Sequence, residues 1–377
     1  MGNRVFITGM GLFTPLGIGV DNNWKSLICR DNVFTPYKIK KSSKEDELYV
    51  GAIKCKNQDS KYSTMVKTVL SEALYDKELL YDKRLGRTAL IFGSSLGNAT
   101  YMNKLIKKRE SDMNLCEILP EYLAYSLAEE YLIQSQILVM NAACSSSSYA
   151  IGKAYQLIKD DIADKAYVVG VDAAVSEMGL TSFSALGVLS QDPYMRPFDV
   201  KHNGFILSEG AGALVLQKNP QRAYAEIIGF GSSCDSYHIV APDPEGKGAV
   251  LAMQKALEDA KITPEDIDYI NCHGTGTRLN DIAEYEALQK VFSKKVLASS
   301  TKAITGHLLG ACGIVETIFS CLAINKKIVP GTANLECPIG KGNVILPKDD
   351  RKENISIVMN NTFAFGGQNA SIILKKV

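Results

Sequence analysis

The sequence predicts an α/β protein made of two similar halves, each with a mainly parallel sheet that helices cover on both faces. Short apolar segments such as Val5–Thr8 and 166–173 are typical of buried strands. They alternate with segments of helical period, which favours a parallel sheet between layers of helices. The strand and Gly-x-Gly pattern of residues 5–11 recurs at 225–231, and this echo indicates a repeated α/β unit within the 377 residues.

The first half alternates strands and helices up to a glycine-rich loop at 195–210. Its mixed, polar segment 100–130 is expected to form helices and loop. The apolar pattern predicts strands at 5–8, 87–92, 131–140, 166–173 and 213–216, and helices at 20–30, 62–76 and 149–159.

A polar segment with Pro220, residues 217–223, is the predicted boundary. It divides the chain into an N-terminal half, 1–222, and a C-terminal half, 223–377. The second half is predicted to contain strands at 225–231, 267–271, 295–298, 355–360 and 370–375, and helices at 248–260, 281–292 and 307–325.

The composition is that of a soluble globular protein, with 46% hydrophobic and 22% charged residues. A formal net charge of +1 gives no electrostatic reason to expect nucleic acid or a membrane surface as partner. The nine cysteines are scattered without a C-x-x-C pair, which indicates reduced thiols in the cytoplasm and no zinc site. The N-terminal apolar run is too short for a signal peptide, and we predict no transmembrane helix.

A glycine-rich turn at Gly9, Gly11 and Gly17 raises the alternative of a dinucleotide site. The fingerprint G-x-G-x-x-G fails because position 14 is Thr, and no acidic residue is placed to hold a ribose. We therefore predict no bound nucleotide cofactor.

Cys144 lies where the predicted strand 131–140 turns into the predicted helix 149–159. Free backbone N–H groups and the helix dipole at such a turn favour a thiolate, so we expect a lowered pKa and a nucleophile. The alternative is a buried cysteine that serves as a small core residue, and this stretch alone leaves both open.

Two of the four histidines, His273 and His307, lie in glycine-rich turns after predicted strands. Loops at the carboxyl ends of parallel strands are where α/β folds place their sites. Because His307 is expected to open a helix, the dipole should keep its imidazole neutral. A third glycine turn around Phe365 is either a structural β-turn or a source of a backbone N–H for an oxyanion hole.

These segments closely resemble the elongating β-ketoacyl-[acyl-carrier-protein] synthases. The resemblance runs from Arg4 to Lys375. It rests on five ordered motifs: Ala143-Cys144-Ser145-Ser146, His273-Gly274-Thr275-Gly276-Thr277, Lys302, Thr305-Gly306-His307-Leu308-Leu309-Gly310, and Phe363-Ala364-Phe365-Gly366-Gly367. It implies a thiolase-like, five-layered αβαβα fold of two similar halves. It also implies a dimer, with the strand before Cys144 at the interface.

The resemblance implies decarboxylative Claisen condensation. An acyl chain passes from the phosphopantetheine of acyl carrier protein to Cys144, and the carbanion from a malonyl thioester then attacks it. No cofactor or metal is expected. The resemblance implies that Cys144 is the nucleophile, that the backbone N–H groups of Cys144 and Phe365 form the oxyanion hole, and that His273 and His307 donate to the enolate. It implies supporting roles for Lys302, which would hold His307, for Asp281 as the partner of Lys302, and for Glu316 as anchor of the loop. The acyl pocket and its gate would be formed by Leu96, Phe363 and Phe365.

The chain also departs from the fatty-acid elongation type. Gly276 stands where that type usually has Ser, and Ser145–Ser148 replace its usual Thr-Ser-Gly. These features favour a type II polyketide or aryl-polyene ketosynthase, either as a homodimer or paired with a homologous chain-length-factor-like subunit. The alternatives are a housekeeping 3-oxoacyl-ACP synthase II and, in another class, a non-catalytic chain-length or scaffold subunit. Cys144, His273 and His307 argue against the last.

Overall fold

The structure is a computed structural model that describes all residues except 1, 42–43, 56–60, 76–86 and 109–113. The end of the predicted helix 62–76 and part of the segment 100–130 therefore lie outside the described residues.

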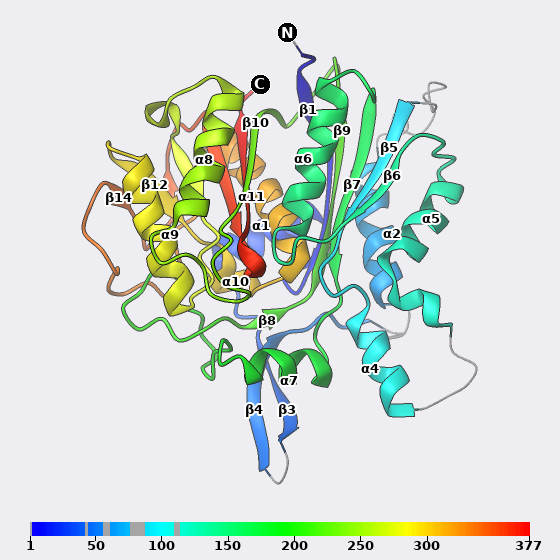
Figure 1. Cartoon of the computed structure of the whole chain (residues 1–377), viewed down its shortest axis with the longest axis vertical. Coiled ribbons are helices and arrows are strands. Elements are labelled where there is room, and N and C mark those ends of the chain that lie inside the picture. Colours follow the sequence, from blue (N-terminus) through cyan, green and yellow to red (C-terminus); the bar gives the residue numbers. More distant parts are fainter. Residues whose placement is uncertain (1, 42–43, 56–60, 76–86, 109–113) are drawn as a thin grey trace.

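Two five-strand units with the same connectivity form the framework of the fold (Figure 1). The first has the order β6-β5-β7-β9-β1 and the second β12-β11-β16-β17-β10. In each unit two neighbouring pairs are parallel and two are antiparallel. The strands are β1 (Val5–Thr14), β5 (Thr88–Gly93), β6 (Ile137–Met140), β7 (Lys165–Asp172), β9 (Gly210–Gln217), β10 (Ala225–Cys234), β11 (Tyr269–Asn271), β12 (Val296–Ser299), β16 (Ile357–Phe363) and β17 (Gln368–Lys375).

This topology corrects the expectation of mainly parallel sheets. A hairpin makes β17 antiparallel to β16, β17 is also antiparallel to β10, and β9 runs antiparallel between β1 and β7. The units join where β1 pairs with β10. The repeated order accounts for the echo between residues 5–11 and 225–231, since these segments begin β1 and β10. The division of the chain between residues 222 and 223 stays a prediction.

Five layers result from the way helices cover the strands. Helices α6 (Ser146–Lys159) and α11 (Cys312–Lys326) form the middle layer, and each contacts strands of both units. Helices α2 (Lys61–Ala73) and α5 (Pro120–Glu130) cover the outer face of the first unit. Helix α8 (Lys247–Ala260) covers the second unit and packs against α9 (Arg278–Val291). The thiolase-like αβαβα arrangement expected from the sequence is therefore confirmed.

The place of helix α11 in the middle layer accounts for its apolar composition. Residues 312–324 are all buried, which is why the helix is apolar around its whole circumference. The stretch Leu309–Lys326 is long and apolar enough to cross a membrane by composition, but 89% of it is buried inside the protein. It is therefore the core helix of the fold.

Shorter elements surround this framework. They are α1 (Val20–Cys29), α4 (Ala99–Lys108), α7 (Glu177–Ala185), α10 (Lys302–Thr305), β2 (Gly17–Ile18), β3 (Thr35–Lys41), β4 (Lys44–Gly51), β8 (Leu207–Ser208), β13 (Ile328–Val329), β14 (Val344–Ile345), β15 (Arg351–Lys352) and the 3-10 turns η2 (Leu115–Ile118), η3 (Pro264–Asp266), η4 (Leu309–Ala311) and η5 (Phe365–Gly367).

Several predicted elements are shorter than expected, and two of these differences bear on the site. The strand predicted at 131–140 is reduced to β6, because residues 131–136 form the turn that follows α5. The helix predicted at 307–325 begins only at Cys312, so His307 lies in the turn before it.

Candidate active site

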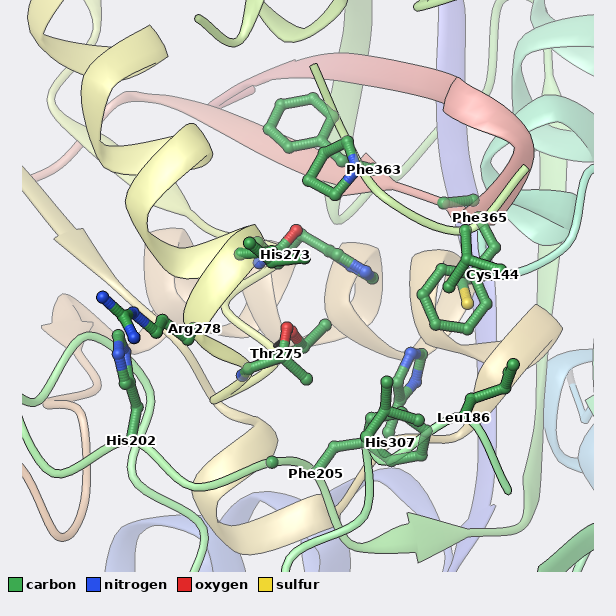
Figure 2. Close-up of a pocket in the computed structure, with 18 of the residues that line it drawn as sticks. Cys144, Leu186, His202, Phe205, His273, Thr275, Arg278, His307, Phe363 and Phe365 are labelled. Atoms are coloured by element: carbon green, nitrogen blue, oxygen red, sulfur yellow. Dashed lines mark hydrogen bonds between the residues drawn. The ribbon is translucent and has the colours of Figure 1, made fainter. Parts of the chain in front are cut away.

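Three side chains from three loops meet at the carboxyl ends of parallel strands (Figure 2). Cys144 follows β6, His273 follows β11, and His307 lies in the connection after β12. The sulfur of Cys144 and ring nitrogens of the two histidines all lie within 4.8 Å of one another. The structure therefore brings together the three residues that the sequence singled out.

Cys144 lies in a tight turn directly before α6. The preceding Ala143 has a φ of 48°, in the left-handed region that non-glycine residues rarely adopt. Ser145 is the N-cap residue of α6, so Cys144 lies just outside the helix. The backbone N–H groups of Phe365 and of Cys144 itself hydrogen-bond the sulfur. Two donors thus converge beside the thiol from opposite halves of the chain.

The expected low thiol pKa is wrong for the resting protein. Burial raises the pKa of Cys144 to about 12, against the opposing effects of the Lys302 charge and the two backbone N–H groups. The side chain is only 5% exposed, and so the helix start does not compensate for the loss of water around a thiolate. The thiol proton must therefore leave during the reaction.

The serine run after Cys144 fastens α6 to the rest of the site, and all four serines are fully buried. The Ser145 hydroxyl lies within hydrogen-bond distance of two backbone oxygens, those of Thr362 (2.9 Å) and Gln368 (2.8 Å), to either of which it can donate. The Ser147 hydroxyl accepts from the N–H of Ile314 in α11 (3.0 Å). The run therefore links the cysteine turn to the β16–β17 hairpin and to the middle-layer helix.

The His307 ring is fixed in one orientation by its backbone and by one ring nitrogen. Its N–H donates to the Ile206 oxygen (2.8 Å), and its own oxygen accepts from Ser208 N–H (3.0 Å). Nδ1 accepts from Leu309 N–H (3.2 Å), which leaves Nε2 to carry the hydrogen. The ring packs edge-on against Phe205, with centroids 4.8 Å apart.

Both imidazoles are neutral. Burial and the charge of Lys302 hold the pKa of His307 well below its usual value. Burial acts most strongly on His273 too, with contributions from Lys302 and His307, and lowers its pKa in the same way. The sequence therefore predicted the protonation state of His307 correctly, although the cause is burial and a nearby cation, since the ring does not open a helix. The rings lie 5.4 Å apart at 81°.

Glu284 in α9 holds the His273 loop, a role that the sequence analysis missed. Its carboxylate accepts from the backbone N–H groups of His273 (2.8 Å) and Gly274 (2.7 Å). Gly274 has a φ of 40°, and a Cβ there would lie 2.5 Å from that of Ser300. Among the described residues, His273 Nδ1 has no hydrogen-bond partner, so its tautomer is not fixed as that of His307 is.

The prediction that Asp281 pairs with Lys302 is wrong. Lys302 is completely buried and its Nζ pairs with Glu316 of α11. Asp281 instead accepts from the backbone N–H groups of Phe198 (2.7 Å) and Gly276 (3.1 Å). Asp281 lies in the first turn of α9 and Glu316 lies in α11. Only α11 belongs to the middle layer, so only Glu316 reaches Lys302 there.

Asp172, at the end of β7, is a second feature that the sequence analysis missed. Its carboxylate accepts from the backbone N–H groups of residues 95–97 and from that of Gly310 (2.6 Å). Burial raises its pKa to about 6 despite these donors. It thereby ties the loop after β5 to the turn that follows His307. An acidic residue at the end of a fully buried strand was the available signal.

A cavity of about 330 Å³ opens onto Cys144, His273 and His307. Apolar side chains line it from two sides, Phe363 and Phe365 on one and Leu186 and Phe205 on the other, and Thr275 and Arg278 contribute polar groups (Figure 2). Phe363 and Phe365 are thus placed where a pocket or gate requires them. Leu96, which was also expected in the acyl pocket, does not line this cavity. It is 40% exposed, and its N–H donates to Asp172 (2.8 Å).

The Cys144, His273 and His307 atoms are also close enough to hold one metal ion together. Thiolate and imidazole are ligands that zinc accepts. The sequence analysis predicts no metal here, and this stays a prediction.

Comparison with known proteins agrees with the fold and shows the family. The sequence models of the family described as "Beta-ketoacyl synthase" match residues 57–222 with the N-terminal domain and 224–336 with the C-terminal domain. The 3-oxoacyl-[acyl-carrier-protein] synthase 2 of Vibrio cholerae is 32% identical, with 99% of each chain covered. That of Staphylococcus aureus is 31% identical, with 99% of this chain and 98% of the relative covered.

Solved structures show the same similarity. The ketosynthase ApeO in complex with its chain length factor ApeC, from Xenorhabdus doucetiae, has a TM-score of 0.88 at 29% identity and covers 100% of this chain and 98% of its own. The ishigamide ketosynthase/chain length factor has a TM-score of 0.88 at 26% identity, with both chains fully covered.

The five-layered fold and the buried cysteine between two neutral histidines define a condensing enzyme. The chain belongs to the β-ketoacyl synthase family and is an acyltransferase that forms carbon–carbon bonds.

Proposed function

We propose that the protein condenses a Cys144-bound acyl chain with malonyl-acyl-carrier-protein by decarboxylative Claisen chemistry. The observation that carries this proposal is the convergence of a thiol and two neutral imidazoles within 4.8 Å at one cavity. A thiol can hold an acyl group, and neutral imidazole N–H groups can stabilise an enolate. The expected substrates are therefore thioesters on the phosphopantetheine of acyl carrier protein, for which the cavity provides an apolar channel with hydroxyls at Thr275 and Thr277.

In the first step, the sulfur of Cys144 attacks the carbonyl of the acyl thioester. The thiol proton passes to the departing carrier sulfur, and His273 is the available relay because its Nδ1 has no partner among the described residues. The N–H groups of Cys144 and Phe365, which lie beside the sulfur, are the donors that we propose for the tetrahedral oxyanion. Collapse breaks the bond to the carrier sulfur and leaves an acyl-cysteine. Each such donor typically stabilises the transition state by about 3 kcal/mol.

In the second step, the malonyl thioester loses carbon dioxide. The electron pair of the broken C–C bond forms an enolate whose oxygen accepts from His307 Nε2–H and from His273. The resulting carbanion attacks the acyl carbonyl, and the C–S bond to Cys144 breaks to release the β-ketoacyl carrier. Burial is the main reason why both rings stay neutral, and the charge of Lys302, which Glu316 holds in place, adds to this effect. This scheme requires no cofactor or metal; that expectation and the cytoplasmic location stay predictions.

For the pathway, we propose a type II polyketide or aryl-polyene system. The serine run Ser145–Ser148 and Gly276 distinguish the chain from fatty-acid elongation enzymes, and ketosynthases in complex with chain length factors are among its structural relatives. Housekeeping 3-oxoacyl-ACP synthesis is the alternative, favoured by the 32% identity to a synthase 2 over 99% of the chain. The length of the product chain, measured with a fixed supply of acyl-carrier and malonyl-carrier substrates, distinguishes these two pathways.

The partner surface that we propose is the edge formed by β6. Within the described part of the chain β6 pairs with β5 alone, and its four residues are only half-buried. Helix α5, which packs against β6, exposes apolar side chains along it and at its two ends: Leu119, Tyr122, Tyr125 and Leu132. A second copy or a homologous chain-length-factor-like subunit would extend the sheet there. Light scattering of the chain alone, and with a coexpressed homologue, separates a homodimer from a heterodimer; a stable monomer in both would refute the proposal.

Intact mass spectrometry with acyl carrier protein tests the proposed function. We expect an acyl adduct on the native chain and on Cys337→Ala, an exposed-cysteine control, but not on Cys144→Ala. The absence of an adduct with every acyl chain offered would favour the non-catalytic scaffold subunit over the enzyme.

A further inference from the structure

A second buried cysteine contacts the ring of His307. Cys312, the first residue of α11, is completely buried, and its Sγ lies 3.1 Å from His307 Nδ1. The mechanism above uses only the opposite ring nitrogen of His307, so it assigns no task to this contact. This contact bears on how the ring is held, and its link to catalysis rests on the proposed function.

The direction of this hydrogen bond follows from the neighbouring backbone. Nδ1 already accepts from Leu309 N–H (3.2 Å), so this nitrogen carries a lone pair and no hydrogen. The thiol is then the donor. Burial raises the pKa of Cys312 well above its usual value, so the group remains S–H.

We propose that Cys312 is a positioning residue, which donates its thiol hydrogen to His307 Nδ1 and so holds the ring as the Nε2–H tautomer. In the other tautomer the hydrogen on Nδ1 would face the thiol hydrogen of Cys312. Nε2 would then present a lone pair to the site in place of its N–H donor. An enolate oxygen would then meet a lone pair, and the stabilisation would be lost. Two donors at Nδ1 disfavour that state more than the backbone N–H alone.

Cys312 belongs to the same helix as Glu316, the acidic member of the buried ion pair. Cys312 and Glu316 are one turn apart on α11, so their side chains lie on the same face. Lys302, paired with Glu316, acts electrostatically on both Cys312 and His307. The thiol is thus the side chain through which α11 contacts the histidine directly.

The tautomer can be measured because the chain has only four histidines. Nitrogen NMR of ¹⁵N-histidine-labelled protein is compared for the native chain, Cys312→Ala, Cys312→Ser and the control Cys321→Ala, which removes another fully buried thiol of the same helix. His307→Gln assigns the signal. We expect the Nδ1 signal of Cys312→Ala to move towards that of a less hydrogen-bonded imine nitrogen, with the Nδ1–H tautomer becoming populated. Cys312→Ser, which retains a donor, should resemble the native chain.

Malonyl-carrier decarboxylation is measured on the same four proteins. A donor of this kind corresponds to a rate loss of about two- to tenfold in Cys312→Ala, with rescue by Ser and no change in Cys321→Ala. An unchanged Nδ1 signal in Cys312→Ala, or equal rate losses in the Ala and Ser variants, would overturn the positioning role. A native chain that forms no carbon dioxide would instead refute the proposed function, while the NMR comparison would still decide the role of Cys312.

Discussion

Replacing Lys302 by Met should destabilise the protein more at alkaline pH than at acidic pH. Both members of the Lys302–Glu316 pair are buried, at 0% and 2% side-chain exposure. Removal of one partner of such a pair typically costs about 3–5 kcal/mol, because the other charge is left uncompensated. Met fills a similar volume, so the change removes mainly the charge.

The sign of the pH effect follows from Glu316. Burial raises its pKa to about 7 even while Lys302 lowers it, so loss of Lys302 should raise it further. An unfolded glutamate titrates near 4.3. The folded variant therefore retains a proton that the unfolded chain releases, and its stability falls as pH rises through this window. Between pH 6 and 8 the native chain loses stability only until about pH 7, whereas the variant goes on losing stability up to pH 8. Over this interval the variant therefore loses about 1.4 kcal/mol more than the native chain.

Denaturant unfolding at pH 6 and pH 8, at one fixed protein concentration, measures this difference. The control is the double variant Lys302→Met/Glu316→Gln, which has no carboxyl to titrate and should lose the additional pH dependence. Equal destabilisation of Lys302→Met at both pH values would refute the argument that folded Glu316 retains a proton that the unfolded chain releases.

Three further outcomes follow from the same site. Asp172→Asn should lower the free energy of unfolding, measured in urea, by about 2–3 kcal/mol. In the native protein the backbone N–H groups meet a carboxylate oxygen, whereas an amide would present a donor to some of them. A change below about 0.5 kcal/mol would contradict this. Glu284→Gln should slow malonyl decarboxylation at least about tenfold while acylation of Cys144 stays within twofold, because the loop of His273 loses an acceptor; equal losses in both steps would count against it. Dialysis against EDTA should leave the condensation rate unchanged, and a loss restored by one divalent cation would disprove the metal-free scheme.

The sequence predicted the fold and the three central side chains because their signals are local. Cys144 and His273 directly follow short strands, and His307 lies in a recognisable glycine turn. Phe365 was predicted from its own glycine turn, and its N–H does reach the sulfur. Each signal needs only a few neighbouring residues to be recognised.

The supporting residues could not be predicted in this way, because their partners lie far away along the chain. Asp172 accepts from Gly310, 138 positions later. Lys302 pairs with Glu316 although Asp281 was the expected partner, since spacing does not reveal towards which layer a helix directs a side chain. The thiol pKa was mispredicted for the same reason: a helix start is visible in the sequence, but the burial of Cys144 depends on both halves.

The central claim is that Cys144 holds the acyl chain while the two histidines drive carbon–carbon bond formation. It is tested most directly by first loading the protein with an acyl group and then adding malonyl-acyl-carrier-protein for a single turnover, followed by intact mass. The account predicts that the native chain loses its acyl group and yields a carrier-bound product two carbons longer, whereas His307→Ala keeps its acyl-cysteine. Elongation at the native rate by His307→Ala, or an acylated native chain that never elongates, would contradict it.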